Sequence, residues 1–202
     1  MKAILAILAI LAYWAVYFAL HSALASSSVK TRVHARWPEF PYRLAYNILA
    51  IILLLPAIWL LWGRSWPVIW EFDGGWRYVA WLLQGLAMTG FLLSLRYYDM
   101  GAFLGLRPES ETRFAISPFH RFVRHPWYCF ALVLIWSFDM NSGRLATSIM
   151  ATLYLFLGSR HEENMLVERF GAGYAEYRKK VPGLIPLPWK YLSRREAATL
   201  VK

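Results

Sequence analysis

Residues 3–25 read AILAILAILAYWAVYFALHSALA, a run without any Asp, Glu, Lys or Arg. A transmembrane helix needs about 20 predominantly apolar residues, so this run is long enough to cross a bilayer. Its end, Ala23-Leu24-Ala25, also fits a signal-peptide cleavage site. Because the run is longer than the apolar core of a signal peptide, and only Lys2 provides a preceding charge, we favour a retained membrane span.

Four further apolar runs extend this interpretation. Runs 44–62 and 78–95 are long enough to span a bilayer, and membrane helices tolerate a proline such as Pro56. Runs 126–138 and 145–158 are shorter and flank a polar turn, which predicts a helical hairpin. The sequence therefore predicts an all-α, polytopic membrane helix bundle of about five segments. The last two would form the hairpin, and cytoplasmic C-terminal helices would follow.

The composition agrees with a membrane protein. Hydrophobic residues make up 58% of the 202 residues and charged residues 17%, against about 45–50% and about 25% in typical globular proteins. Such a chain has too little polar surface for a water-soluble globule, and it is neither disordered nor fibrous in type. Cys129 is the only cysteine, which excludes an intramolecular disulfide.

The distribution of the charges that give the net charge of +10 agrees with this topology. With five segments and an external N-terminus, segments 26–43, 96–124 and 159–202 share one side and carry 18 of the 22 Lys and Arg residues. The positive-inside rule places that side, with the C-terminus, in the cytoplasm, so we expect an integral membrane protein of the bacterial inner membrane type. Anionic lipid then explains the charge better than nucleic acid does. We divide the chain into a three-span part, 1–95, and a part with most of the chemistry, 96–202.

A first polar cluster, Arg124-His125-Pro126-Trp127-Tyr128, directly precedes and begins run 126–138. Proline is favoured in the first turn of a helix, and a helix N-terminus offers unpaired N–H groups and partial positive charge. Together with Arg124 and His125, this end suits a carboxylate or a phosphate. The alternative is that the basic residues only contact lipid headgroups at the cytoplasmic interface.

A second polar cluster, Arg160-His161-Glu162-Glu163, follows the hairpin on a helix that we expect to continue into the cytoplasm. Its carboxylates could bind hydroxyl groups and a cation, or they could simply be solvated. The histidines lack H-x-x-x-H spacing, so we expect no metal site. The linker 96–124 begins with a Gly-containing, aromatic stretch up to Pro108, and it is either a solvated loop or a flap over a cytoplasmic cavity.

Four motifs follow one another in this part of the chain: Arg124-His125-Pro126-Trp127-Tyr128, Glu162-Glu163-x-x-Leu166, Phe170-Gly171-x-x-Tyr174-x-x-Tyr177 and Val181-Pro182-x-x-Ile185-Pro186. In this order they resemble the isoprenylcysteine carboxyl methyltransferase-like family, which includes phospholipid methyltransferases and methanethiol S-methyltransferases. The resemblance covers about 112–187. In addition, Phe18-Ala19-Leu20-His21-Ser22 is similar to the bacterial thiol methyltransferase and NnrU-like branches.

The resemblance implies S-adenosyl-L-methionine as the methyl donor, bound on the cytoplasmic side. Arg and His side chains and helix N–H groups suit the donor's carboxylate, Glu162 its ribose diol, and Trp127 or Tyr128 its adenine or its cation. We take Arg160 and Glu163 as candidate catalytic residues. The candidate cofactor-binding residues are Thr112, Arg113, Phe114, Ala115, His120, Arg124, His125, Pro126, Trp127, Tyr128 and Glu162.

The sequence departs from the family at three positions. His120 stands where tyrosine is common, and Phe130 where glycine is common. Gly158 stands where the eukaryotic prenylcysteine enzymes have a substrate-binding arginine, which argues against a prenylcysteine carboxylate as the acceptor.

Two kinds of function agree with these motifs, and a third needs no catalysis. The favoured one is a membrane methyltransferase that acts on a small or lipophilic acceptor, with a thiol or a carboxylate favoured. The alternatives are a nicotinamide-dependent reductase of the sterol-reductase type, whose long N-terminal part is not seen here, and a non-catalytic NnrU-like membrane protein. The expected partners are the methyl acceptor and membrane lipid, while the oligomeric state is not predicted.

Overall fold

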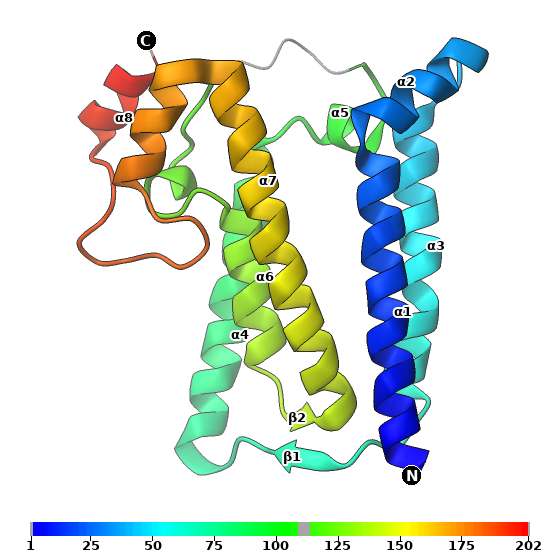
Figure 1. The fold of residues 1–202 in the computed structure, drawn as a ribbon. Helices are drawn as coiled ribbons and strands as arrows, with labels where there is room; N and C mark the ends of the chain where they lie inside the picture. The colour runs from blue at the N-terminus through cyan, green and yellow to red at the C-terminus, as the bar shows by residue number, and fades with distance from the viewer. Residues whose placement is uncertain (1, 109–113, 202) are drawn as a thin grey trace. The chain divides into compact units, whose positions relative to one another are not determined.

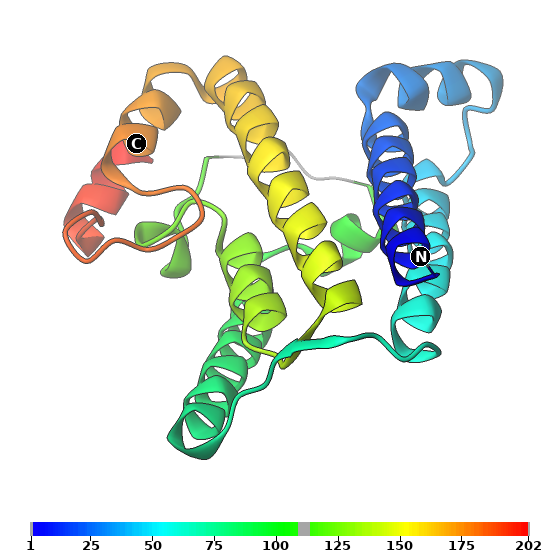
Figure 2. The same cartoon turned by 60° about the horizontal axis from the view of Figure 1, so that its bottom comes forward.

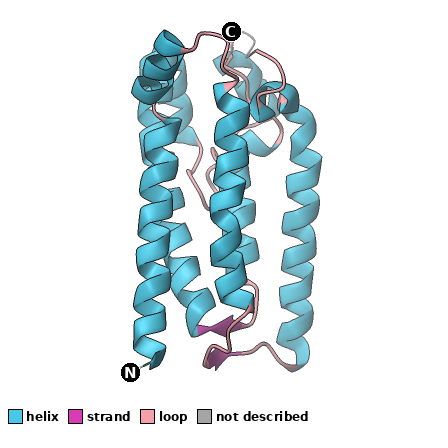
Figure 3. Ribbon diagram, turned by 90° about the vertical axis from the view of Figure 1, so that its right-hand side faces the viewer, coloured by secondary structure: helices cyan, strands magenta, loops and turns pink. Residues whose placement is uncertain are grey.

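The structure, a computed structural model, describes residues 2–108 and 114–201. The described residues form eight α-helices, two short 3-10 turns and a small two-stranded ladder, so the predicted all-α fold is confirmed (Figures 1 and 3). The helices are α1 (Lys2–Ala25), α2 (Ser27–Arg36), α3 (Tyr42–Trp62), α4 (Gly74–Ser94), α5 (Met100–Leu104), α6 (Pro126–Trp136), α7 (Ser142–Lys180) and α8 (Arg194–Leu200). The 3-10 turns are η1 (Leu95–Tyr97) and η2 (Phe119–Arg121), and the strands are β1 (Val68–Trp70) and β2 (Met140–Asn141).

Three helices are long and apolar enough to cross a membrane: α1, α3, and α4 with its extension to Tyr97. They coincide with three of the predicted spans. Many of their large apolar side chains are exposed, including Ile51 on α3 and Leu82 on α4. Exposed apolar surface on this scale is unusual for a water-soluble monomer and fits helices that face lipid. Pro56 lies inside α3 as expected.

The chain forms two compact units that each combine segments distant in the sequence. The first comprises 1–71, 99–110 and 139–151, and the second comprises 72–98, 111–138 and 152–202. The boundary between the units falls inside α7. The division at residue 95 that we expect for function stays a prediction.

In the first unit, α1 and α3 lie side by side (Figures 1 and 2). Ile10, Trp14 and Ala57 form a buried core between them together with Ala146 of α7. The indole Nε1 of Trp14 donates a hydrogen bond to Thr147 Oγ1 at 2.9 Å. The antiparallel pair of β1 and β2 belongs to the same unit. β1 lies between α3 and α4, and β2 lies in the segment that the sequence presents only as a polar turn.

In the second unit, α4 packs along α6. Gln84 Nε2 donates to the Ser137 carbonyl oxygen at 2.7 Å, which gives this polar side chain in the middle of α4 a partner. The ring of Phe130 lies against Gly90, where a Cβ atom would come within 2.7 Å of it. Phe130 is thus accommodated by a glycine on the neighbouring helix.

The long helix α7 joins the predicted hairpin to the C-terminal part. Its first turns include run 145–158, and the helix continues to residue 180 as expected, with a kink at Gly171 (φ 61°). After the kink, Tyr174, Tyr177 and Val181 pack against Leu192 and against Ala197 of α8. This cluster holds the C-terminal part of the chain against residues 114–124, where the predicted site lies.

Candidate functional site

The start of α6 forms the centre of the site. Pro126 occupies the first turn and His125 is the N-cap residue, as the sequence predicts. The backbone N–H groups of Arg124 and His125 donate to the carbonyl oxygens of Pro182 and Gly183 at 2.8 and 3.1 Å. Consequently, segment 181–183, far along the chain, is fixed beside the helix N-terminus.

The register of α6 against α7 brings the two predicted polar clusters together. Near one end, Trp136 Nε1 donates to Thr152 Oγ1 at 3.0 Å. At the other end, the His125 ring contacts Glu163. The separation from His125 to Trp136 equals that from Thr152 to Glu163, so both contacts fit one antiparallel register. The hairpin geometry therefore places Glu162 and Glu163 beside His125.

Arg124 is the main tether of this region. Its Nε and Nη2 atoms donate to Glu163 Oε1 at 2.9 and 2.6 Å, and Nη1 donates to the carbonyl oxygens of Arg178, at 2.8 Å, and Val181. The Arg124 and Glu163 side chains are only 11% and 4% exposed. Two N–H groups of Arg124 converge on one oxygen of the buried Glu163 carboxylate, and such charged hydrogen bonds fix geometry as well as charge. Arg124 thus connects α6, α7 and the segment that follows α7.

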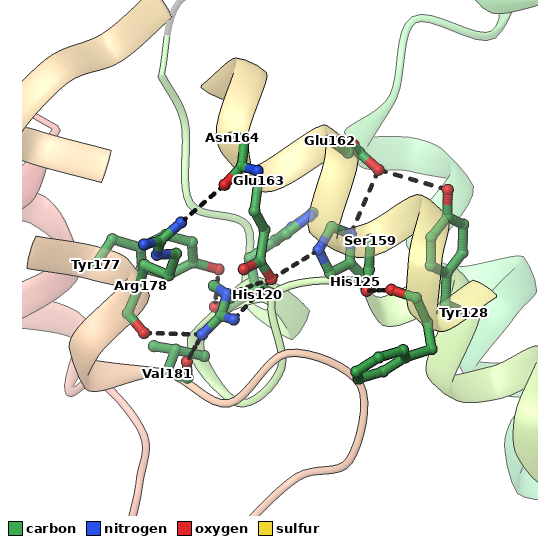
Figure 4. A network of polar contacts seen from close by, with 12 residues as sticks. His120, His125, Tyr128, Ser159, Glu162, Glu163, Asn164, Tyr177, Arg178 and Val181 are labelled. Atoms are coloured by element: carbon green, nitrogen blue, oxygen red, sulfur yellow. Dashed lines mark hydrogen bonds and ion pairs between the residues drawn. The ribbon is translucent and has the colours of Figure 1, made fainter. Parts of the chain in front are cut away.

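His125 lies between two carboxylates. Its Nε2 is 3.1 Å from Glu163 Oε1 and its Nδ1 is 3.5 Å from Glu162 Oε2 (Figure 4). Burial alone would lower the pKa of His125, but hydrogen bonds to Glu162 and Glu163 outweigh burial and raise it. Because a neutral imidazole carries one N–H, contacts with carboxylates on both nitrogens favour the imidazolium.

Glu163 is the ionised partner of Arg124 and His125. Burial would raise the pKa of its carboxyl group, but hydrogen bonds from His125 and Arg124 outweigh burial and lower it. The buried carboxylate therefore balances the charge beneath the site, while its neighbour Glu162 reaches the surface.

Glu162 is the accessible carboxylate of the cluster, with its side chain 44% exposed. The Tyr128 hydroxyl donates to Glu162 Oε2 at 3.4 Å (Figure 4), and the Tyr128 ring stacks on His125 with centroids 5.2 Å apart. Both polar contacts to Oε2 are long. Glu162 is therefore oriented by its neighbours yet keeps acceptor capacity for a ligand hydroxyl or cation.

An aromatic group adjoins this carboxylate. The rings of Trp127 and Tyr98 have centroids 4.3 Å apart, and Trp127 Nε1 donates to Ser94 Oγ at 2.7 Å. The Tyr98 hydroxyl lies 3.3 Å from His120 Nε2, and Ser117 Oγ lies 2.6 Å from His120 Nδ1. Aromatic faces at this position can stack on a planar base or stabilise a cation.

This part of the site keeps its side chains uncharged. Burial, and after it the positive charge of His125, lowers the pKa of His120 to about 4. Burial and the Glu162 carboxylate raise the pKa of Tyr98 to about 12. His120 is therefore a neutral imidazole and Tyr98 a neutral phenol at physiological pH.

Tyr98 and Ser117 are site residues that the sequence analysis missed. Tyr98 belongs to the linker that we considered as a flap, directly after a predicted span, so its position at a membrane end was a usable signal. Ser117 stands three residues before His120, and no motif marks it.

The remaining predicted residues lie around the cluster or outside it. The ring of Phe114 packs against Tyr177, centroids 5.6 Å apart, and the Tyr177 hydroxyl donates to the His120 carbonyl oxygen at 2.6 Å. Ala115 lines a separate cavity of about 490 Å³ near α8. The exposed guanidinium of Arg160 lies over the Phe156 ring at 5.2 Å. Thr112 and Arg113 lie outside the described residues.

The structure thus brings together a specific subset of the predicted site. This subset comprises His120, Arg124, His125, Pro126, Trp127, Tyr128, Glu162 and Glu163. Among residues 2–108 and 114–201, no group of three His, Cys, Asp or Glu side chains could hold a metal ion. The assembled side chains are suited to a polar, partly cationic ligand with hydroxyls and an aromatic base.

Comparison with known proteins gives distant relatives of one kind. The chain is 28% identical over 179 residues to methanethiol S-methyltransferase 2 of Bradyrhizobium diazoefficiens, covering 82% of this chain and 68% of the relative. It is 29% identical over 187 residues to a methanethiol S-methyltransferase of Mycobacterium tuberculosis, covering 85% and 74%. A Pseudomonas deceptionensis enzyme of that name is 28% identical over 177 residues, covering 82% and 67%. No family profile and no solved structure matches the chain.

Proposed function

We propose that the protein is an integral membrane methyltransferase that uses S-adenosyl-L-methionine and methylates a small thiol. The observation that carries the proposal is the breadth of the similarity to methanethiol S-methyltransferases. An alignment over 82% of the chain includes most of the polar cluster between Tyr98 and Gly183 as well as membrane helices. The distant homology therefore concerns the candidate site and is not confined to apolar spans.

The side chains of the cluster fit the chemical groups of the donor. Glu162 keeps acceptor capacity for a ribose diol, and the faces of Trp127 and Tyr128 suit adenine or a sulfonium. The helix N–H groups of Trp127 and Tyr128 and the neutral His120 can meet a carboxylate or a polar ring atom. When bound, the donor would supply a methyl group already activated on a positively charged sulfur.

The protein's own contribution is then chiefly positional. Arg124 and Glu163 hold α6, α7 and segment 178–183 in one arrangement, and His125 extends that arrangement to Glu162. Tyr98, whose ring lies tilted against that of Trp127, excludes water from one side of the cluster. Fixed orientation and exclusion of water are large terms in group transfer between two bound reactants.

The membrane setting is part of the proposal. A cytoplasmic C-terminus, as the distribution of Lys and Arg predicts, gives the charged donor access from the cytoplasm. A small apolar thiol dissolves in the bilayer and can reach the cluster laterally. The bacterial inner membrane is the compartment that fits this topology.

Methanethiol and a labelled methyl donor, added to the purified protein in lipid nanodiscs, test the proposal. We expect labelled dimethyl sulfide in the headspace and micromolar binding of the donor by titration. A labelled lipid product instead would redirect the proposal to a lipid acceptor. Binding of NADPH without binding of the donor would support a reductase, and binding of neither would leave a non-catalytic membrane protein.

A further inference from the structure

The segment between Gly183 and Leu192 exposes large apolar side chains on a constrained turn. Ile185 is 67% exposed, Trp189 78% and Tyr191 52%. The Lys190 N–H donates to the Leu187 carbonyl oxygen at 3.0 Å, which closes the turn, and Pro186 and Pro188 stiffen it. A turn with this composition is not a typical solvated loop, because turns in water are usually polar.

Both ends of this turn are fixed to residues 121–125, which lead into α6. The carbonyl oxygens of Pro182 and Gly183 accept from the N–H groups of Arg124 and His125. At the other end, the Leu192 N–H donates to the Arg121 carbonyl oxygen at 3.0 Å, and Arg121 Nε donates back to the Leu192 carbonyl oxygen at 2.9 Å. The turn therefore lies at the level of the α6 N-terminus within the second unit, as the orange and red segment in Figure 1 shows.

A neighbouring aromatic residue extends the apolar surface. Phe122 is 46% exposed, and its ring stacks on Tyr191 with centroids 5.9 Å apart. We define the apolar loop as residues 184–191 together with Phe122. Its exposed aromatic rings form a patch of the kind found where membrane proteins meet the headgroup region.

The charges around the apolar loop are positive. Lys190 lies in the loop, the Arg121 guanidinium lies over the Phe122 ring at 5.4 Å, and Arg194 and Arg195 follow directly. The sequence has no Asp or Glu from 183 to 195. Aromatic rings bordered by lysine and arginine complement an anionic lipid surface, where each basic residue near the headgroups adds attraction.

We propose that the apolar loop inserts into the headgroup region of an anionic phospholipid bilayer, on the side of the membrane where α6 begins. The partner is the lipid surface itself. Since the stem of the loop accepts hydrogen bonds from Arg124 and His125, insertion braces the polar cluster against the membrane. The inference rests on the loop geometry and on the membrane helices, so it is independent of the methyl transfer reaction.

Depth-dependent quenching tests this placement. Cys129 is the only cysteine, so Cys129→Ser provides a background for Trp189→Cys with a fluorescent label, and Lys179→Cys, whose native side chain is 76% exposed, is the matched control. In anionic nanodiscs we expect nitroxide lipids to quench the label at position 189 at least threefold more than the control label. Aqueous iodide should show the opposite order. Equal iodide quenching at both positions would overturn the proposal.

Two further measurements keep the test decisive. If Cys129→Ser does not fold, brominated lipids can quench tryptophan in the protein that retains Cys129, and Trp189→Phe should lower the quenched fraction. An unchanged quenched fraction would count against insertion. Zwitterionic nanodiscs should give weaker nitroxide quenching than anionic ones, and equal quenching would remove the role assigned to the basic residues.

Discussion

Replacing Arg124 with alanine removes the donor that holds three segments together. The guanidinium gives two hydrogen bonds to Glu163 and one each to the carbonyl oxygens of Arg178 and Val181. Removing one partner of a buried ion pair costs about 3–5 kcal/mol, because a charge stays buried without compensation. Glu163 keeps the contact with His125, so we expect the lower end of that range, about 3 kcal/mol.

The free energy of unfolding in mixed detergent micelles, titrated with a denaturing detergent, measures this loss. Arg121→Ala is the control, because Arg121 Nε makes one hydrogen bond, to the Leu192 carbonyl oxygen, and its loss costs about 1 kcal/mol. Arg124→Lys should recover only part of the stability, since an ammonium group cannot reproduce the fixed arrangement of the guanidinium donors. Donor affinity in nanodiscs should fall for Arg124→Ala and stay nearly unchanged for Arg121→Ala.

Two results would contradict the stabilising role assigned to Arg124. The first is equal stability of the Arg124→Ala and Arg121→Ala variants. The second is strict additivity when Arg124→Ala is combined with Glu163→Gln. The double variant no longer buries a carboxylate, so it should be more stable than the sum of the two single losses predicts, by about 1 kcal/mol or more.

Three other predictions concern the donor, the protons and the membrane. Glu162→Gln should weaken donor binding about tenfold or more, since a charged hydrogen bond contributes about 1.5–3 kcal/mol, and an unchanged titration curve would mark Glu162 as a solvated residue. Stability should peak near pH 6.5, the ordinary pKa of histidine. The raised pKa of His125 stabilises the fold below pH 6.5, and this contribution is lost as the pH rises through the raised pKa. The lowered pKa of His120, about 4, stabilises the fold above pH 6.5, and this contribution is lost as the pH falls toward 4. When the free energy of unfolding is plotted against pH, His125→Gln should remove the slope on the alkaline side and His120→Gln the slope on the acidic side. Retention of both slopes would contradict these assignments. A C-terminal reporter should be active in the cytoplasm, and activity only in the periplasm would overturn the topology.

The long apolar helices could be predicted because the signal is local. Continuous apolar composition defines α1, α3 and α4, and Pro126 marks the start of α6. The short helix α8 was missed although Ser193-Arg194-Arg195-Glu196 carries a capping box, in which the Ser193 side chain accepts from the Glu196 N–H. Its low hydrophobicity and short length gave no periodic pattern to support that signal.

The pairing within the site depends on tertiary register, which the sequence did not supply. Arg124 and Glu163 were each chosen for chemistry, Arg124 as a donor contact and Glu163 as a catalytic residue. Their ion pair follows from the register of α6 against α7, which is visible only once the Trp136–Thr152 and His125–Glu163 contacts are known. Those contacts also show Arg124 and Glu163 supporting each other beneath the more exposed Glu162.

The C-terminal motif Val181-Pro182-x-x-Ile185-Pro186 gains a physical role from the same cluster. The carbonyl oxygens of Val181, Pro182 and Gly183 accept from Arg124 and His125, so the backbone of this segment does the binding. Backbone groups do not depend on side-chain identity, except where a side chain would intrude. At Gly183, a Cβ atom would lie 3.3 Å from Arg124 Nη2 and 3.5 Å from Glu163 Oε1, closer on the arginine side than most side-chain contacts. Glycine at this position lets the segment approach the buried ion pair, which explains how a motif defined by apolar side chains belongs to the site.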